Sequence, residues 1–202
     1  MKTLFDEIDD KEKDKILKVL ETKPIKFSKN EIISNNEVDY NIGIILKGEA
    51  NVEKYDYDGN RSILEKLSDN SLFGKYFYQF GKDISIVTTM ECEVLLLDYD
   101  SIINKVKNKV FLSNFFNLLS KKIIDENIRL EILSKRTIKD KLLSYFIILS
   151  KDKPKQIFTL PFTYTDLADY LFVDRSAMMR EIKKLKNSGI IKTKGKLIKL
   201  LD

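Results

Sequence analysis

Two short helical patterns joined by a brief turn, in residues 163–187, constrain the fold of this chain more than any other feature. Thr163 is a suitable N-cap for the first helix, with Asp166 at the capping-box position, and Asp174 is a suitable N-cap for the second. Spacings of three and four residues place apolar side chains where the two helices face each other. These side chains are Leu167, Ala168 and Leu171 in the first helix and Met178, Ile182 and Leu185 in the second.

A predicted hairpin follows the second helix. Gly189 is placed to end that helix as a C′ residue. Residues 190–201 (IIKTKGKLIKLL) then contain two short β patterns that turn at Lys194-Gly195. The sequence therefore predicts a winged helix-turn-helix in its carboxy-terminal part.

The outward side of the second helix, the predicted recognition helix 174–187, has the chemistry to bind DNA. Its apolar positions face inward, so Arg175, Ser176, Met179 and Arg180 must point away from the domain. A helix in the major groove presents its first two turns to base edges, and a guanidinium group matches guanine O6 and N7 bidentately. The lysines predicted to contact phosphates are Lys183, Lys184 and Lys186 on this helix and Lys192, Lys194 and Lys196 on the wing. The alternative is that the arginines simply occupy a solvated face.

Charge is distributed unevenly along the chain. Residues 1–134 carry 20 Lys and Arg against 24 Asp and Glu, whereas residues 135–202 carry 16 against 7. A basic carboxy-terminal part indicates a nucleic-acid partner, although a lysine-rich solvated surface would have the same composition.

From Lys23 to Asp100 the pattern is that of β structure. Short apolar runs alternate with turn signals such as SKNE, LKGE and YDGN, which favours an antiparallel roll or barrel over βαβ units. The Asp58-Gly59 pair is predicted to turn a hairpin.

Residues 109–134 have a helical period with a heptad seam. Its apolar members are Leu112, Phe116, Leu119, Ile123, Leu130 and Leu133, and Glu126 takes the one polar position. We expect this helix to join two copies of the chain; the alternative is that it packs wholly within its own chain. A second helix follows, with Thr137 as N-cap and Pro154 beyond its end. The expected α+β organisation is a β-roll in residues 1–108, a dimerisation helix in 109–134 and a DNA-binding domain in 135–202.

These features together resemble the bacterial Crp/Fnr transcription regulators. The resemblance covers nearly the whole chain and is carried by YTDLADYL and DRSAMMREIKKLKNSGII, by IILKGEANVEKYDYDGN in the amino-terminal part, and by Gly74 at the position of the family's turn glycine. It implies an N-terminal roll like a cyclic-nucleotide-binding jelly roll and a homodimer that binds an inverted repeat, with RNA polymerase as a partner. It also implies base contacts from Arg175, Ser176, Met179 and Arg180, and phosphates beside Tyr164 and Thr165.

The chain departs from the family's pattern at the effector site. Cyclic-nucleotide-binding members have Glu after the turn glycine and a later Arg-Ser/Thr pair, but here Lys75 and Tyr76 follow Gly74, and GKDISIV lacks arginine. Phe172 also stands where the family usually has Gly. A pocket for an anionic or aromatic effector of unknown identity is predicted at Lys75, Tyr76, Tyr78 and Lys82. Alternatively, these aromatic residues fill the roll and contact the long helix.

Composition excludes several other functions. With Cys92 as the single cysteine and no histidine, we expect no iron–sulfur cluster, His-ligated haem or His-ligated zinc. The commonest general base is absent too, so we expect no enzyme, and a cupin-like enzyme would need a His-rich metal site. No apolar run approaches about 18 residues and the amino terminus is acidic, which indicates a cytoplasmic protein. The remaining rival hypothesis is a ligand-binding β-roll acting through protein partners, with a degenerate helix-turn-helix.

Overall fold

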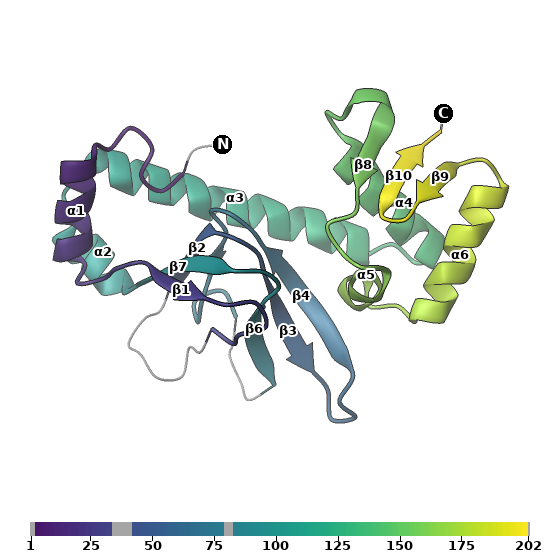
Figure 1. Ribbon diagram of the computed structural model, residues 1–202, viewed down its shortest axis with the longest axis horizontal. Helices are drawn as coiled ribbons and strands as arrows, with labels where there is room; N and C mark the ends of the chain where they lie inside the picture. The colour runs from purple at the N-terminus through teal and green to yellow at the C-terminus, as the bar shows by residue number, and fades with distance from the viewer. Residues whose placement is uncertain (1–2, 34–41, 79–82, 202) are drawn as a thin grey trace. The chain divides into compact units, whose positions relative to one another are not determined.

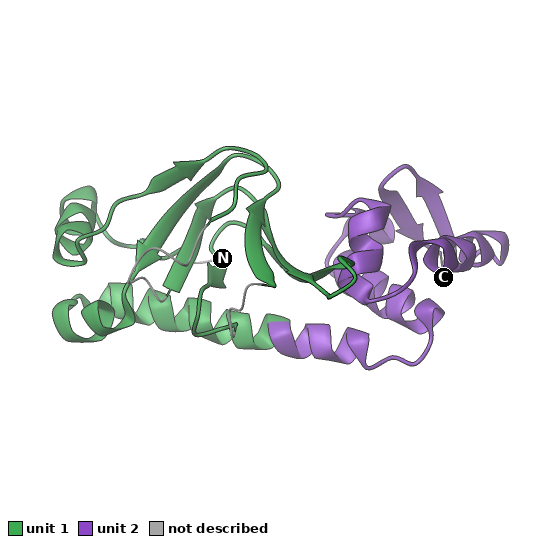
Figure 2. Cartoon of the chain, turned by 90° about the horizontal axis from the view of Figure 1, so that it is seen from below, with its two compact units in different colours: residues 1–125 green, residues 126–202 purple. Residues whose placement is uncertain are grey.

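The computed structural model describes residues 3–33, 42–78 and 83–201, and the chain divides into two compact units, residues 1–125 and 126–202 (Figure 2). The first unit contains, in chain order, α1 (Asp10–Val19), β1 (Ile25–Phe27), β2 (Ile42–Lys47), β3 (Ala50–Tyr55), β4 (Arg61–Leu67), β5 (Leu72–Phe73), β6 (Ile84–Thr88), β7 (Cys92–Leu97), α2 (Tyr99–Lys105) and the first part of α3 (Lys109–Leu133).

Two antiparallel sheets form the roll of the first unit (Figure 1). One has the strand order β1-β7-β2-β5 and the other β4-β3-β6, so the antiparallel roll predicted from the short apolar runs is confirmed. The predicted hairpin at Asp58-Gly59 joins β3 and β4, which pair from Ala50 opposite Leu67 to Tyr55 opposite Arg61.

Strands β2 and β7 are buried on both faces. Ile44 and Leu95 belong to the apolar core that α1, α2 and α3 cover, whereas Ile45 and Val94 belong to the core between the two sheets. A strand buried on both faces needs apolar side chains at successive positions, which explains the continuous runs IGIIL and VLLL. Helix α1 was not predicted; Asp9 caps it by accepting a hydrogen bond from the Glu12 backbone at 2.9 Å.

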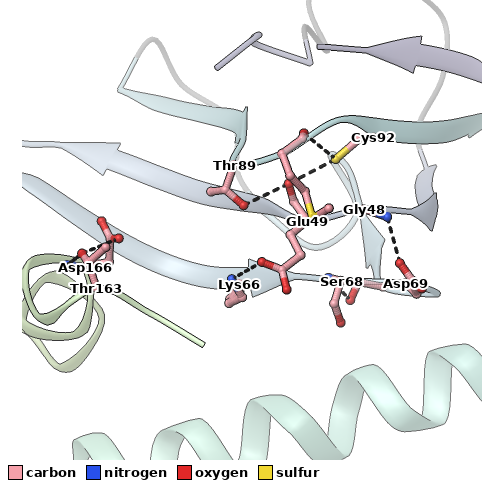
Figure 3. A network of polar contacts seen from close by, with 11 residues as sticks. Gly48, Glu49, Lys66, Ser68, Asp69, Thr89, Cys92, Thr163 and Asp166 are labelled. Carbon is pink, nitrogen blue, oxygen red and sulfur yellow. Dashed lines mark hydrogen bonds and ion pairs between the residues drawn. The ribbon is translucent and has the colours of Figure 1, made fainter. Parts of the chain in front are cut away.

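The turn at Gly48 carries the chain from one sheet to the other. Gly48 has a φ of 107°, and a Cβ there would lie 2.3 Å from a backbone oxygen beside β7, so only glycine fits. Polar contacts hold the next residue, Glu49, in place (Figure 3). The Glu49 carbonyl accepts hydrogen bonds from the Thr89 hydroxyl and the Cys92 thiol, both at 3.1 Å. The Glu49 carboxylate pairs with the Lys66 ammonium at 2.6 Å. Cys92 is a buried strand residue, and burial raises the pKa of its thiol.

The second unit contains the last turns of α3, then α4 (Ile138–Ser150), a 3₁₀ turn η1 (Pro154–Gln156), β8 (Ile157–Thr159), α5 (Tyr164–Leu171), α6 (Arg175–Asn187), β9 (Ile191–Lys194) and β10 (Leu197–Leu200). Thr137 caps α4 as predicted, with its hydroxyl accepting from the Asp140 backbone at 3.1 Å. Strand β8, which was not predicted, completes a sheet of order β8-β10-β9. No helix among the described residues is long and apolar enough to cross a membrane.

Candidate nucleic-acid interface

The two helices of the helix-turn-helix begin where their caps were predicted. The Thr163 hydroxyl accepts from the Asp166 backbone at 3.1 Å and donates to the Asp166 carboxylate at 2.7 Å. The Asp174 carboxylate accepts from the Ala177 backbone at 2.7 Å. The predicted inward residues are all buried, namely Leu167, Ala168, Leu171, Met178, Ile182 and Leu185. Their burial fixes which side of α6 remains exposed.

The exposed side of α6 carries most of the predicted base-contacting residues. Arg175, Ser176, Arg180 and Lys183 are exposed, as predicted. Met179 differs, because it is half-buried at the boundary between the two faces. Successive helical residues are about 100° apart, so the residue after buried Met178 reaches only the edge of the exposed face.

The wing is a tight hairpin with lysines at its tip. Lys194 pairs with Leu197, which leaves Gly195 and Lys196 as the turn residues, one position later than predicted. Gly195 has a φ of 58°, which glycine adopts without steric cost. Lys192, Lys194 and Lys196 are exposed, so the wing presents ammonium groups in the arrangement expected for phosphate contacts.

Tyr164 and Thr165 were both predicted to lie beside phosphates, and the two side chains have different surroundings. The Tyr164 hydroxyl donates to the Gly195 carbonyl in the wing turn at 2.9 Å, and this side chain is half-buried. Burial raises the pKa of the Tyr164 hydroxyl, although a hydrogen bond with Thr193 lowers it, so the phenol stays a neutral donor. Thr165 is exposed in the first turn of α5.

The turn between α5 and α6 has an unusual backbone conformation. Phe172, at the family's glycine position, has a left-handed conformation with φ 53° and ψ 55°. Such a conformation costs a non-glycine residue about 1–2 kcal/mol. The Lys141 ammonium of α4 donates to the preceding carbonyl, that of Leu171, at 3.0 Å.

The heptad seam of α3 is only partly used within the chain. Phe116, Ile123 and Leu130 are 58%, 63% and 64% exposed. Leu112 and Leu119 are half-buried and pack against the core of the first unit. The three exposed residues are seven positions apart and form one apolar stripe, which we name the α3 stripe.

The three described residues of the predicted effector pocket have different surroundings. Lys75 and Tyr76 are exposed, and the Tyr76 ring packs on Tyr99 with centroids 5.4 Å apart. Tyr78 instead packs against the core between the sheets, and its hydroxyl accepts from the Lys122 ammonium at 2.8 Å. Lys82 lies outside the described residues. For Tyr78 the alternative is correct, because this ring fills the roll and contacts the long helix.

Two buried cations on α3 were missed. Lys122 forms an ion pair with Glu65 of β4 and donates to Tyr78. Arg129 stacks on aromatic rings of α5 and the turn after it. Lys122 continues the i+3, i+4 series of Phe115 and Leu118, so its inward position was detectable; the identity of its partners was not. No group of three or more Cys, Asp or Glu that could hold a metal occurs within residues 3–33, 42–78 and 83–201.

A β-roll, a long helix and a carboxy-terminal winged helix-turn-helix define the architecture of the Crp/Fnr transcription regulators, and the chain has that fold. Residues 140–202 match the family model of the Crp-like helix-turn-helix domain. No curated protein sequence matches the chain.

Solved structures of similar fold cover nearly the whole chain. A CooA variant from Carboxydothermus hydrogenoformans has a TM-score of 0.77 at 17% identity, covering 98% of this chain and 88% of its own. CprK complexed with OCPA has a TM-score of 0.73 at 16% identity, covering 96% of this chain and 92% of its own. A CRP/FNR-family transcriptional regulator from Thermus thermophilus has a TM-score of 0.62 at 19% identity, covering 89% of this chain and 94% of its own.

Proposed function

We propose that this chain is a homodimeric, sequence-specific DNA-binding transcription regulator of the Crp/Fnr type that binds an inverted repeat. The observation that carries the proposal is the exposed side of α6, where Arg175, Ser176 and Arg180 follow a capped helix start. A capped amino terminus with exposed guanidinium groups suits the major groove, where arginine pairs bidentately with guanine.

The two kinds of cation in this interface have different roles. Arg180 and Arg175 contact base edges and give specificity, with Ser176 and Met179 beside them. Lys183, Lys194 and Lys196 contact phosphates and give affinity that falls with salt. The net +9 of residues 135–202 supports a polyanionic partner, because it exceeds what a solvated domain of this size needs for solubility.

The α3 stripe supports the homodimer. Phe116, Ile123 and Leu130 expose apolar surface at heptad spacing, the pattern by which two helices associate. A twofold axis along α3 relates two copies of α6, and an operator for such a dimer has half-site centres about 34–36 Å apart. We propose that a small-molecule effector of unidentified chemistry acts on the roll and that RNA polymerase is a partner on DNA. CprK, which has a similar fold, is known in complex with OCPA.

Selection of binding sites from random DNA, with full-length protein, tests the proposal. We expect an inverted repeat, and we expect Arg180→Ala to weaken binding by about 1–3 kcal/mol per half-site and to relax preference at one base pair. Lys194→Ala is the matched control: it should weaken all sequences alike and reduce the salt slope by about one per contact. Failure of the wild-type protein to enrich any sequence would refute sequence-specific binding. An unchanged motif for Arg180→Ala would remove this arginine from the base contacts.

A further inference from the structure

Arg129 brings a buried positive charge from α3 to the turn between α5 and α6. The residue is 7% exposed, and its guanidinium carbon lies 4.0 Å from the centroid of the Tyr170 ring and 5.2 Å from that of Phe172. A planar guanidinium stacks on aromatic faces, and the attraction strengthens when the cation loses water. All three residues belong to the second unit.

The rings that Arg129 contacts flank the least favourable backbone of the helix-turn-helix. Phe172 is left-handed, a conformation that non-glycine residues keep only where the surroundings hold it. Lys141 holds the same turn through the Leu171 carbonyl at 3.0 Å. Three consecutive residues are thus held by cations from α3 and α4, neither of which is a helix of the helix-turn-helix itself.

We infer that Arg129 is a positioning residue for the recognition helix. By stacking on Tyr170 and Phe172 it holds the left-handed turn, and the turn sets the angle at which α6 leaves α5. Because α6 begins at Arg175, three residues after Phe172, a change in this turn displaces Arg175 and Arg180 together. The inference rests on the proposed function, since the angle matters for binding only if α6 contacts DNA.

The position of Arg129 on α3 gives the contact a second consequence. The next residue, Leu130, belongs to the exposed α3 stripe. One turn of a single helix therefore carries both a residue of the proposed dimer contact and the residue that holds the recognition helix. The dimer sets the distance between two recognition helices, and Arg129 sets the tilt of each.

The first test measures DNA binding by the full chain. The probes are the duplex selected by the wild-type protein and a scrambled duplex of equal length. Arg129→Ala should weaken binding to the selected duplex by about tenfold or more, with scrambled-duplex affinity unchanged within about twofold. Arg129→Lys should behave similarly, because an ammonium lacks the planar face. Lys135→Ala, which removes an equal charge whose partner is Glu131, is the control and should leave both affinities within about twofold.

The pattern across the two duplexes decides the outcome. Equal losses on both would show that Arg129→Ala only lowers the folded fraction, and would overturn the inference. Equal effects of Arg129→Ala and Lys135→Ala would overturn it too, because charge alone would then account for the loss.

Phe172→Gly provides a second variant that lacks the strained side chain. Glycine adopts the left-handed turn without penalty, so the loss caused by Arg129→Ala should shrink to about threefold or less in this background. Losses that multiply independently in the double variant would contradict the inference.

Hydrogen exchange tests the contact without DNA. The Val173 amide, bonded to the Ala168 carbonyl at 3.1 Å, should exchange about tenfold faster in Arg129→Ala, whereas amides of the β10 strand should not change. Unchanged exchange at Val173 would overturn the inference and leave the proposed function standing. If the wild-type protein selects no duplex, the proposed function fails and the exchange result still decides whether Arg129 holds the turn.

Discussion

At the scale of single residues, the Tyr164 hydroxyl connects two elements of the candidate nucleic-acid interface. Its hydrogen bond to the Gly195 carbonyl ties the first turn of α5 to the tip of the wing. The exposed lysines 194 and 196 flank the residue that is held. We therefore expect the order of the wing tip to depend on this phenol.

Tyr164→Phe removes that hydrogen bond and keeps the ring. We expect the free energy of unfolding to fall by about 0.5–1.5 kcal/mol, the net contribution of one hydrogen bond. We also expect the slope of log affinity against log salt to become shallower by about one per wing contact. Denaturant unfolding and salt titration of binding measure the two effects. Tyr57→Phe, at an exposed position of the first unit, is the control; an equal change in this variant would argue against a role for the wing contact.

At the scale of elements, α3 presents two sides of different chemistry. One side buries Phe111, Phe115 and Leu118 in the core of the first unit, and it also buries Lys122. The other side carries the exposed α3 stripe. A single helix thus contributes to its own fold and carries the surface that we propose for dimerisation.

Ile123→Glu tests the α3 stripe. Placing a charge in a packed helix pair costs several kcal/mol per site by estimate, so we expect monomers and loss of operator binding. Leu119 is a poorer choice, because it also packs against the core of the first unit. Asn117→Glu puts the same charge at an exposed position outside the heptad seam and should leave the dimer intact. Sedimentation that finds stable dimers of Ile123→Glu would remove the stripe from the interface.

The buried pair of Lys122 and Glu65 joins α3 to β4. Lys122→Met should lower the free energy of unfolding by about 3 kcal/mol, because Glu65 would lose the lysine that neutralises it. Lys122→Met/Glu65→Gln should recover most of that loss. Lys121→Met, whose pair with Asp125 is solvent-exposed at 4.0 Å, should change stability by less than about 0.5 kcal/mol. Equal losses for the two lysines in denaturant unfolding would show that the buried pair is not a stabilising contact.

Sequence patterns predicted the elements better than the contacts between them. The period of α3, the caps at Thr163 and Asp174, and the buried positions of α6 follow from local spacing, and all are confirmed. The passage at Gly48 from one sheet to the other was not predicted, because turn signals do not specify which strands pair.

The partners of buried polar groups could not be predicted from the sequence either. Lys122 lies 57 positions from Glu65, and Arg129 lies more than 40 from Tyr170, so no local pattern connects them. The contact of Tyr164 with the wing turn was missed for the same reason, since its partner Gly195 is 31 positions away. The exposure of Arg175, Ser176 and Arg180 was predicted correctly, because solvent exposure on one helix face follows from its own periodicity.

At the scale of the whole molecule, the amino-terminal and carboxy-terminal parts of the chain carry net charges of opposite sign. Residues 1–134 are net −4 and residues 135–202 are net +9. A polyanion is therefore attracted to the carboxy-terminal part, and an anionic effector of the roll would need specific cations. Arg61 is the only arginine in residues 1–125, and its guanidinium is bound to Glu53 at 3.0 Å.

The chain should not bind cyclic AMP or cyclic GMP. A phosphate held without an arginine fork loses charge-assisted hydrogen bonds worth about 1–3 kcal/mol each. Calorimetry with full-length protein should record no binding heat from either nucleotide, and operator affinity should not change when they are added. Micromolar binding of one of them would contradict the prediction and would make Lys75 a candidate phosphate ligand.

A continuous helix also fixes the angular and axial positions of all its side chains relative to one another. Each residue added to or removed from α3 would turn every later side chain by about 100° and shift it by about 1.5 Å along the axis. Phe115, Lys122 and Arg129 are buried at intervals of seven, and Phe116, Ile123 and Leu130 are exposed at the same intervals. Adding or removing a whole heptad nearly preserves both series, whereas deleting a single residue would bring an isoleucine or a leucine to the place of a cation. Natural variation in the length of this helix is therefore expected in steps of seven, while the loops outside it can change one residue at a time.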